Sequence, residues 1–339
     1  MATRIYKTPF AATGDKEALA TADQPDGKVS LQAGWTPDYE LPNDDANYRP
    51  VGRQEMNGIL GEVTEGLGDI QLNGFASWQP IDGGWPIGAW VSHGGIVFRS
   101  AINNNSNEPG SDSSWVNPLS GQFLGIRVFT STATYTPTPG TSRIVVEVQA
   151  GGGGGGGTEA DLSANTIAVA SGGGAGSYGT LVISEVPTSL VVTVGAGGSG
   201  GTGGFVNGVA GGSSSFGSLL TCAGGLGGAP GRSAQNTVAG PTSSGGAGGA
   251  TPSGATYSYA GAAGNAGLYI NAGVLTGAGG SSRFGGGGAM LGSSTAGFLQ
   301  SSPGTGYGAG GSGSGRVGAG AVGSGGSGSP GIVVIKEYS

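Results

Sequence analysis

The glycine tracts in the second half of the chain limit its fold more than any other feature of the sequence. Of the 79 glycines in 339 residues, 61 lie from Gly151 onward, often as two glycines in every three residues, as in 197–204 and 224–228. A glycine in regular structure costs about 0.5–1 kcal/mol relative to alanine. These tracts can therefore be ordered only if many cooperative hydrogen bonds hold them.

Three structures compete for such tracts. A flexible linker is disfavoured because large apolar residues such as Phe205, Phe216 and Phe284 interrupt the tracts, and linkers do not need them. Collagen requires glycine strictly at every third position with proline between, and this sequence lacks that pattern. Extended helices of polyproline-II geometry repeat every three residues, and glycine lets neighbouring backbones bond to one another. The sequence thus favours packed polyglycine-type helices over disorder.

Strand signals bracket the glycine-rich region. Residues 143–149 and 331–338 are rich in β-branched side chains, and 190–194 has the same character. Weaker strands are expected at 179–184 and 215–222. Because the terminal strands of a domain often pair, we expect 143–149 and 331–338 to close the module. These signals predict a mainly β, glycine-rich C-terminal domain at 121–339.

Residues 53–68 predict the one good helix of the chain. Its apolar side chains recur at helical spacing, namely Met56, Ile59, Leu60, Val63 and Leu67. A helix of this length is marginal alone in water. The stripe therefore either packs on its own domain or pairs with copies of itself in a short bundle. We assign residues 53–74 to a short helical oligomerisation segment.

Residues 75–120 predict a small β-module with tryptophans as its core. The run 89–100 is typical of two short strands around the turn at Gly94 and Gly95. Trp78, Trp85, Trp90 and Trp115 all fall within this module, which is an unusual concentration for a chain with five tryptophans.

The remaining composition argues against several classes of function. The formal charge is −7 and no basic patch is present, so we expect no nucleic-acid partner. The single Cys222 and the single His93 do not make a metal site or a catalytic triad, and we expect no cofactor, metal or catalytic residue. We predict neither a signal peptide nor a membrane span. A glycosidase-like carboxylate pair would have to come from Glu159, Asp161 and Glu185.

The two ends of the chain resemble the tail fibre proteins of tailed bacteriophages and prophages of Gram-negative bacteria. The resemblance lies in Arg4–Phe10, 15–20 and 52–57 at the start, and in 129–140, 144–149, 151–157 and 329–338 at the end. Residues 87–115 are similar to small carbohydrate-binding modules of the chitin-binding type. That similarity implies sugar stacking on Trp90 and Trp115, either of which could instead be core.

The resemblance implies an elongated, multi-domain homotrimeric fibre in the virion, made in the host cytoplasm. Residues 1–52 would attach it to tail or baseplate proteins, and the C-terminal domain would bind a bacterial surface receptor: a pilus, an outer-membrane protein or a glycan. Receptor contacts are expected from aromatic and arginine side chains between glycine tracts. The candidates are Tyr257, Tyr259, Tyr269, Phe298, Tyr307, Arg232 and Arg283.

The first functional hypothesis is therefore a non-enzymatic attachment fibre. The alternative is a tailspike-like depolymerase that cleaves surface polysaccharide, which should show a carboxylate cluster within β-helical repeats. A third possibility, a secreted glycine-rich wall protein, is disfavoured by the varied first 150 residues.

Overall fold

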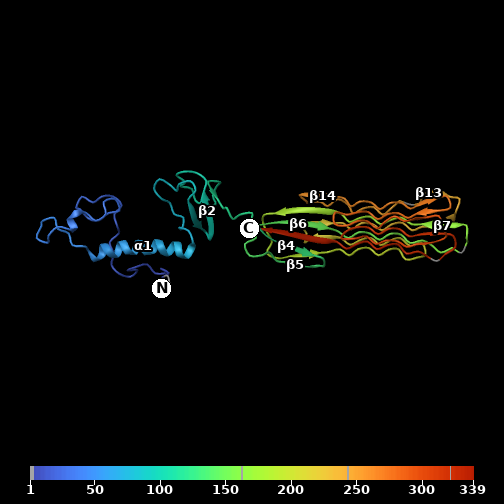
Figure 1. Cartoon of the computed structure of the whole chain (residues 1–339), viewed down its shortest axis with the longest axis horizontal. Helices are drawn as coiled ribbons and strands as arrows, with labels where there is room; N and C mark the ends of the chain where they lie inside the picture. Colours follow the sequence, from blue (N-terminus) through green and yellow to red (C-terminus); the bar gives the residue numbers. More distant parts are fainter. Residues whose placement is uncertain (1–3, 162, 243, 321) are drawn as a thin grey trace. The chain divides into compact units, whose positions relative to one another are not determined.

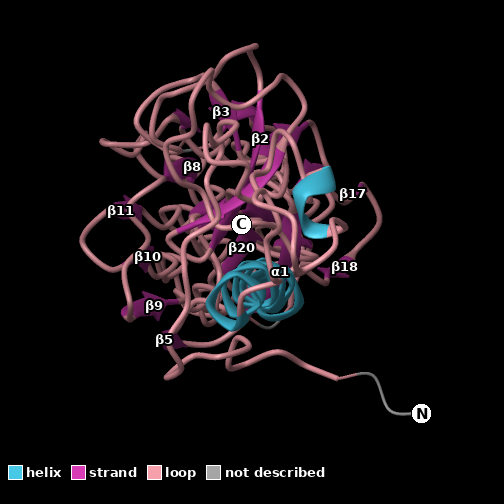
Figure 2. Cartoon of the chain, turned by 90° about the vertical axis from the view of Figure 1, so that its left-hand side faces the viewer, coloured by secondary structure: helices cyan, strands magenta, loops and turns pink. Residues whose placement is uncertain are grey.

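A computed structural model describes residues 4–161, 163–242, 244–320 and 322–339 of the chain. The fold is mainly β, with several small antiparallel sheets and one α-helix. The chain divides into two compact units, Met1–Leu119 and Ser120–Ser339. Figure 2 shows how little of the chain is helical: α1 and one short turn.

The first unit is built around helix α1, Arg53–Asn73. The amide of Gly52 donates to Glu55 Oε2 at 3.1 Å at its start. The helix extends beyond the predicted end at residue 68 and stops at Gly74, whose φ of 77° is left-handed. A short 3-10 turn, η1 (Pro37–Tyr39), precedes it.

The N-terminal arm lies along the glycine face of α1. Gly58, Gly61 and Gly68 are the buried residues of the helix, and a Cβ on Gly58 or Gly68 would collide with a carbonyl oxygen of Glu17 or Tyr6. Helix side chains then fasten the arm: Gln71 accepts from the Tyr6 amide at 2.9 Å, and Thr64 accepts from the Phe10 amide at 2.7 Å. Glycine here allows backbone to approach backbone closely.

The small β-module follows the helix. Strands β1 (Trp90–His93) and β2 (Ile96–Ser100) pair around Gly94 and Gly95, and β3 (Trp115–Val116) pairs with β2. The predicted hairpin is therefore confirmed. Its core contains Val91, Phe98 and Trp115, with Trp78 and Trp85 packed against them.

The second unit contains the remaining strands. They are β4 (Phe123–Phe129), β5 (Ala133–Tyr135), β6 (Arg143–Gln149), β7 (Thr166–Val169), β8 (Tyr178–Ile183), β9 (Leu190–Thr193), β10 (Ser214–Phe216), β11 (Leu220–Cys222), β12 (Ser233–Gln235), β13 (Ala239–Pro241), β14 (Tyr257–Tyr259), β15 (Leu268–Ile270), β16 (Val274–Leu275), β17 (Gly292–Ser293), β18 (Gly297–Leu299), β19 (Gly315–Val317) and β20 (Ile332–Tyr338). Strands β6 and β20 pair along their full length, so the predicted closure of the module is confirmed. The single strand predicted at 215–222 is wrong, because a turn at Gly217 (φ 51°) divides it into β10 and β11.

Between the strands, the glycine tracts run alongside one another (Figure 1). Tract 151–157 is fully buried, and its seven amides donate to three other tracts in strict rotation. Gly151, Gly154 and Gly157 donate to 206–212, Gly152 and Gly155 to 326–329, and Gly153 and Gly156 to 171–174. Its carbonyl groups accept from three further tracts with the same three-residue period.

Tracts 170–177 and 308–314 are equally buried, and each likewise bonds to tracts on all sides. The three buried tracts also bond to one another, as in Gly153 to Gly174, Gly173 to Gly311 and Gly311 to Gly153. Nine outer tracts surround them within the described part of the chain: 195–201, 206–212, 223–230, 244–250, 260–266, 276–281, 285–291, 300–305 and 323–331. Along 195–203 the burial repeats as buried, exposed, intermediate, so one residue in three faces outward.

Sheets of conventional strands cap the two ends of this bundle. At one end, which we call the base, lie the sheet β14-β8-β6-β20-β4 and the sheet β11-β10-β9-β5, the latter running along one side in Figure 2. The base encloses the main core, including Tyr135, Ile144, Phe216 and Ile335. At the other end, which we call the tip, lie β12-β7-β19-β18 and β13-β15-β16-β17 over a smaller core. Figure 1 shows β4, β6 and the C-terminus at the base and β7 and β13 at the tip.

Candidate functional site

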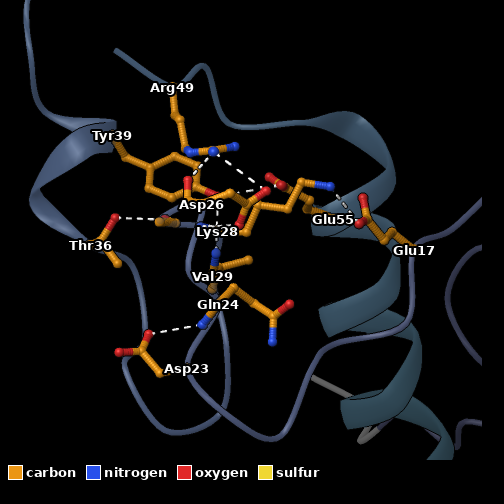
Figure 3. A network of polar contacts seen from close by, with 11 residues as sticks. Glu17, Asp23, Gln24, Asp26, Lys28, Val29, Thr36, Tyr39, Arg49 and Glu55 are labelled. Carbon is orange, nitrogen blue, oxygen red and sulfur yellow. Dashed lines mark hydrogen bonds and ion pairs between the residues drawn. The ribbon is translucent and has the colours of Figure 1, made fainter. Parts of the chain in front are cut away.

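The residues before α1 are fastened to the start of the helix by a polar network (Figure 3). Lys28 Nζ lies 2.8 Å from Glu17 Oε1. Tyr39 accepts from the Val29 amide at 3.1 Å and donates to Glu55 Oε1 at 3.3 Å. These bonds hold residues 17–39, part of the region predicted to attach to other proteins, against the start of α1.

The apolar stripe of α1 faces away from that arm. Met56, Leu60, Val63 and Leu67 are exposed, Val63 by 58%, whereas the predicted Ile59 is only partly exposed. Ile70 extends the stripe by one further step. The spacing of 4, 3, 4 and 3 residues is that of a coiled-coil seam, and no residue of the described first unit covers it in the way the arm covers the glycine face.

The two tryptophans proposed for sugar stacking have different environments. Trp115 is 4% exposed in the module core, and its indole Nε1 donates to the Asn107 carbonyl at 2.7 Å, so it offers no face to a sugar. Trp90 is 42% exposed and stacks on Phe75 at 5.6 Å. Of the two, Trp90 is the one whose ring is exposed.

The structure separates the seven receptor-contact candidates into two groups. Tyr257, Tyr259, Arg283 and Tyr307 lie at the base. Tyr259 stacks on Tyr178 at 5.1 Å, and the Arg283 guanidinium lies 5.0 Å over the same ring. Of these, Arg283 lies close to the carboxylate of Glu147.

Glu147 is a buried carboxylate that pairs with two partly exposed cations at the base. Its carboxylate oxygens accept hydrogen bonds from Lys336 Nζ at 2.7 Å and from the Tyr178 hydroxyl at 2.8 Å. Arg283 Nε lies 3.8 Å from Glu147 Oε2. Burial works to raise the pKa of Glu147, but these donors outweigh it and hold that pKa below its ordinary value. The paired charges indicate a packing role for this cluster.

The other candidates, Arg232, Tyr269 and Phe298, lie at the tip. Within the described residues, six chain connections meet there. They comprise 158–161 with 163–165, 202–205, 231–242, 268–275, 292–299, and 315–320 with 322. The Tyr269 hydroxyl donates to the Arg232 carbonyl at 2.8 Å, which ties two of these connections together. Phe298 in β18 is exposed.

Sequence reasoning missed the group that organises the tip. Ser233 donates its amide to Glu159 and its hydroxyl to Asp161 Oδ2 at 2.6 Å. It also accepts from the guanidinium of Arg316 at 3.0 Å. Arg316 is fully buried and donates further to the Gly318 carbonyl.

A single serine therefore links three connections through one cation and two anions. The only available signal in the sequence was that Glu159, Asp161 and Arg316 are charged residues in an otherwise nearly uncharged region. Nothing in their spacing relates them to Ser233.

The chemistry of these groups is that of fixed charges. The Ser233 hydroxyl and the Ser163 amide lower the pKa of Asp161 to about 2, so this carboxyl holds no proton near neutral pH. Cys222 is buried at the base, and burial raises the pKa of its thiol to about 12.

In the described residues, no three His, Cys, Asp or Glu side chains gather into a metal-binding set. None of the described helices has the length and apolar character needed to cross a membrane.

The fold defines a class: glycine-rich domains whose backbones bond laterally between strand-capped ends. Residues 128–338 match the glycine-rich domain family. Because the match spans more than half of the chain, the protein belongs to that family. Comparison with curated proteins finds no match.

Proposed function

We propose that this protein is a phage tail fibre protein that attaches the virion to a bacterial surface receptor through the tip of its glycine-rich unit. One observation carries the proposal: both ends of the unit lie at the base, where β4 pairs with β20, and six connections gather at the opposite end. The bundle thus displays loops far from its point of attachment. Binding loops on a rigid scaffold are a common arrangement for recognition.

The rigidity of that scaffold follows from the tracts, which we infer to be polyglycine helices of polyproline-II type. Support comes from the three-residue rotation of hydrogen-bond partners along 151–157, which matches three residues per turn. It also comes from the three-residue burial period along 195–203. Such a lattice satisfies buried backbone groups laterally rather than within each tract.

In this proposal the receptor contacts come from Arg232, Tyr269 and Phe298, whereas Tyr259 and Arg283 at the base pack on Tyr178. A non-enzymatic role is favoured over a depolymerase because a glycosidase needs a general acid with a raised pKa. The tip carboxyl of Asp161 has instead a pKa of about 2, and its neighbour Glu159 is bonded to the Ser233 amide.

We further propose that three copies associate through the exposed stripe of α1, and that residues 1–52 bind tail or baseplate proteins. The stripe supports self-association because five exposed apolar residues follow a heptad pattern. The polar network of Lys28, Tyr39 and Glu55 supports a fixed attachment surface.

Fluorescently labelled full-length protein, mixed with a panel of Gram-negative strains, tests the attachment role. We expect binding to at least one strain, and we expect the exposed tip change Phe298→Ala to reduce it at least fivefold. Tyr257→Ala at the base, which removes a side chain that is 62% exposed, should leave binding unchanged. Loss with Tyr257→Ala and not with Phe298→Ala would place the contacts at the base. Release of reducing ends from purified capsule or lipopolysaccharide would favour the depolymerase.

A further inference from the structure

A surface hollow of about 260 Å³ lies at the tip, between three of its connections. Its lining is Phe205, Pro230, Arg232, Thr242 and Tyr269. These residues come from chain segments far apart in sequence, so the hollow exists only in the folded unit. It combines two aromatic walls, two hydroxyl-bearing side chains (Thr242 and Tyr269) and one cation.

The cation is held by an aromatic ring and not by a carboxylate. The Arg232 guanidinium carbon lies 4.3 Å from the centre of the Phe205 ring, and the side chain is exposed. No ion pair joins Arg232 to a described acidic residue within 4.0 Å. A guanidinium that lies over an aromatic ring keeps N–H groups available to bind an anion.

The two carboxylates nearest in the fold are occupied elsewhere. Glu159 accepts from the Ser233 amide, and Asp161 accepts from the Ser233 hydroxyl beside the buried Arg316. The tip network thus satisfies its anions with Ser233 and Arg316. Arg232 remains the tip cation whose charge has no anionic partner in the described chain.

The walls of the hollow are fixed in place. Phe205 has a φ of 66°, a left-handed conformation that a bulky side chain rarely adopts, and this conformation brings its ring to Arg232. Tyr269 packs against the tip core of Ile167 and Val169, and its hydroxyl holds the Arg232 backbone. A preorganised site loses less entropy when it binds.

The net charge of the unit does not oppose an anion. Residues 120–339 carry six arginines and lysines against five acids, whereas residues 1–119 carry seven against fifteen. The chain is acidic overall, but the unit that holds the hollow is not. An anionic ligand that approaches the tip therefore meets a body whose charges are nearly balanced, not an acidic one.

We propose that this hollow binds the anionic group, carboxylate or phosphate, of a bacterial surface glycan, with Arg232 as its direct ligand. The inference rests on the proposed attachment function. A glycan is favoured over an acidic protein because the hollow is small and concave with aromatic walls, whereas a stable protein interface needs about 800 Å² per partner. A sugar ring would lie against Tyr269 and Pro230, and its acidic group would meet the guanidinium edge.

Calorimetric titration of the full-length protein tests the site with four probes: a galacturonate pentasaccharide, its neutral methyl ester, a phosphorylated oligomannose and poly-L-glutamate. We expect one of the two anionic glycans to bind, which identifies carboxylate or phosphate as the recognised group. The methyl ester should not bind, and binding should weaken as salt rises. Arg232→Gln should raise the Kd of the glycan that binds by about tenfold or more, which is the usual effect of removing a charged hydrogen-bond donor.

The matched control is Arg143→Gln, because Arg143 is also exposed and stacked on an aromatic ring, 5.0 Å over Tyr338, but lies at the base. It removes the same charge and should change affinity less than twofold. Circular dichroism of both variants checks that they fold. Equal weakening by both variants, no binding of either anionic glycan, or tighter binding of poly-L-glutamate would each overturn the inference.

The same variants in the whole-cell assay separate this inference from the proposed function. If cell binding survives Arg232→Gln but is lost with Phe298→Ala, the attachment role is supported and the anion site at Arg232 is contradicted. Glycan binding by the protein without cell binding would keep the site and contradict the attachment role.

Discussion

Gly153 and Gly174 lie on neighbouring buried tracts, and the Gly153 amide donates to the Gly174 carbonyl at 2.8 Å. One period further, Gly156 donates to Ser171 at 2.9 Å. A Cβ on Gly153 or Gly173 would come closer than 3.0 Å to a carbonyl oxygen of a neighbouring tract. Here glycine is required by the spacing between backbones and not by a turn.

This spacing predicts that Gly155→Ala destabilises the second unit by about 3 kcal/mol, near the upper range for overpacking. The added methyl would collide with the Ser312 carbonyl, and no flexible side chain can move aside. Urea unfolding of the full-length protein measures the change. Gly125→Ala in β4 is the control, since a Cβ there meets nothing within 4 Å and alanine is the better residue for a strand by up to about 1 kcal/mol. Equal losses in both variants would contradict the lattice argument.

We expect the second unit to lose stability at low pH because of Glu337. It is buried and accepts from the Tyr135 hydroxyl at 2.9 Å and the Thr138 hydroxyl at 2.6 Å. Burial works to raise its pKa, but these donors hold it below the ordinary 4.5. The stabilisation is therefore fully present above about pH 4.5 and is lost as the pH falls through the lower folded value.

Glu337→Gln should cost about 1.5–3 kcal/mol at pH 7, as expected for hydrogen bonds to a charged group. It should also flatten the loss of stability on acidification, as followed by urea unfolding between pH 3 and 7. Glu185→Gln, at an exposed position, should leave both the stability and the acid slope unchanged. A slope that is as steep in Glu337→Gln as in the parent protein would exclude Glu337 as its source.

The sequence predicted those elements whose signal is local. The β-branched runs of β6 and β20, the hairpin around Gly94 and the apolar repeat of α1 all report on their own conformation. The helix continues to Asn73 because Gly74, not Gly68, adopts the left-handed cap. Gly68 is instead a contact with Tyr6, which the sequence does not reveal.

The lateral partners of the tracts could not be read from the sequence. The three buried tracts contain only Gly, Ala and Ser, but the outer tracts 195–201 and 244–250 do too. The tip network could not be predicted for a similar reason, because Ser233 contacts Asp161 and Arg316 only where the lattice brings three connections together. Both features depend on contacts between distant segments, for which residue type alone gives no register.

Ser233→Ala tests that network through one measurable group. The Ser233 hydroxyl is the largest cause of the low pKa of Asp161, about 2, so its removal should raise that pKa towards 3.8. Carbon-detected NMR titration of the carboxyl groups measures the shift. Ser281→Ala, which removes a hydroxyl elsewhere in the unit, should leave Asp161 unchanged. An Asp161 pKa that stays near 2 in Ser233→Ala would assign the effect to the Ser163 amide or to Arg316.

The stripe of α1 predicts the assembly state. If copies associate through it, Leu60→Lys combined with Val63→Lys should convert the protein to monomers, because charged side chains at seam positions oppose helix pairing. The folding of the first unit should not change, since both side chains are already exposed and the arm packs on the glycine face. Leu72→Lys, also exposed but off the stripe, is the matched control and should leave the assembly intact. Sedimentation equilibrium measures the mass of each form. A parent protein that sediments as a monomer, or a trimer that survives both lysines, would show that the stripe is not the contact between copies.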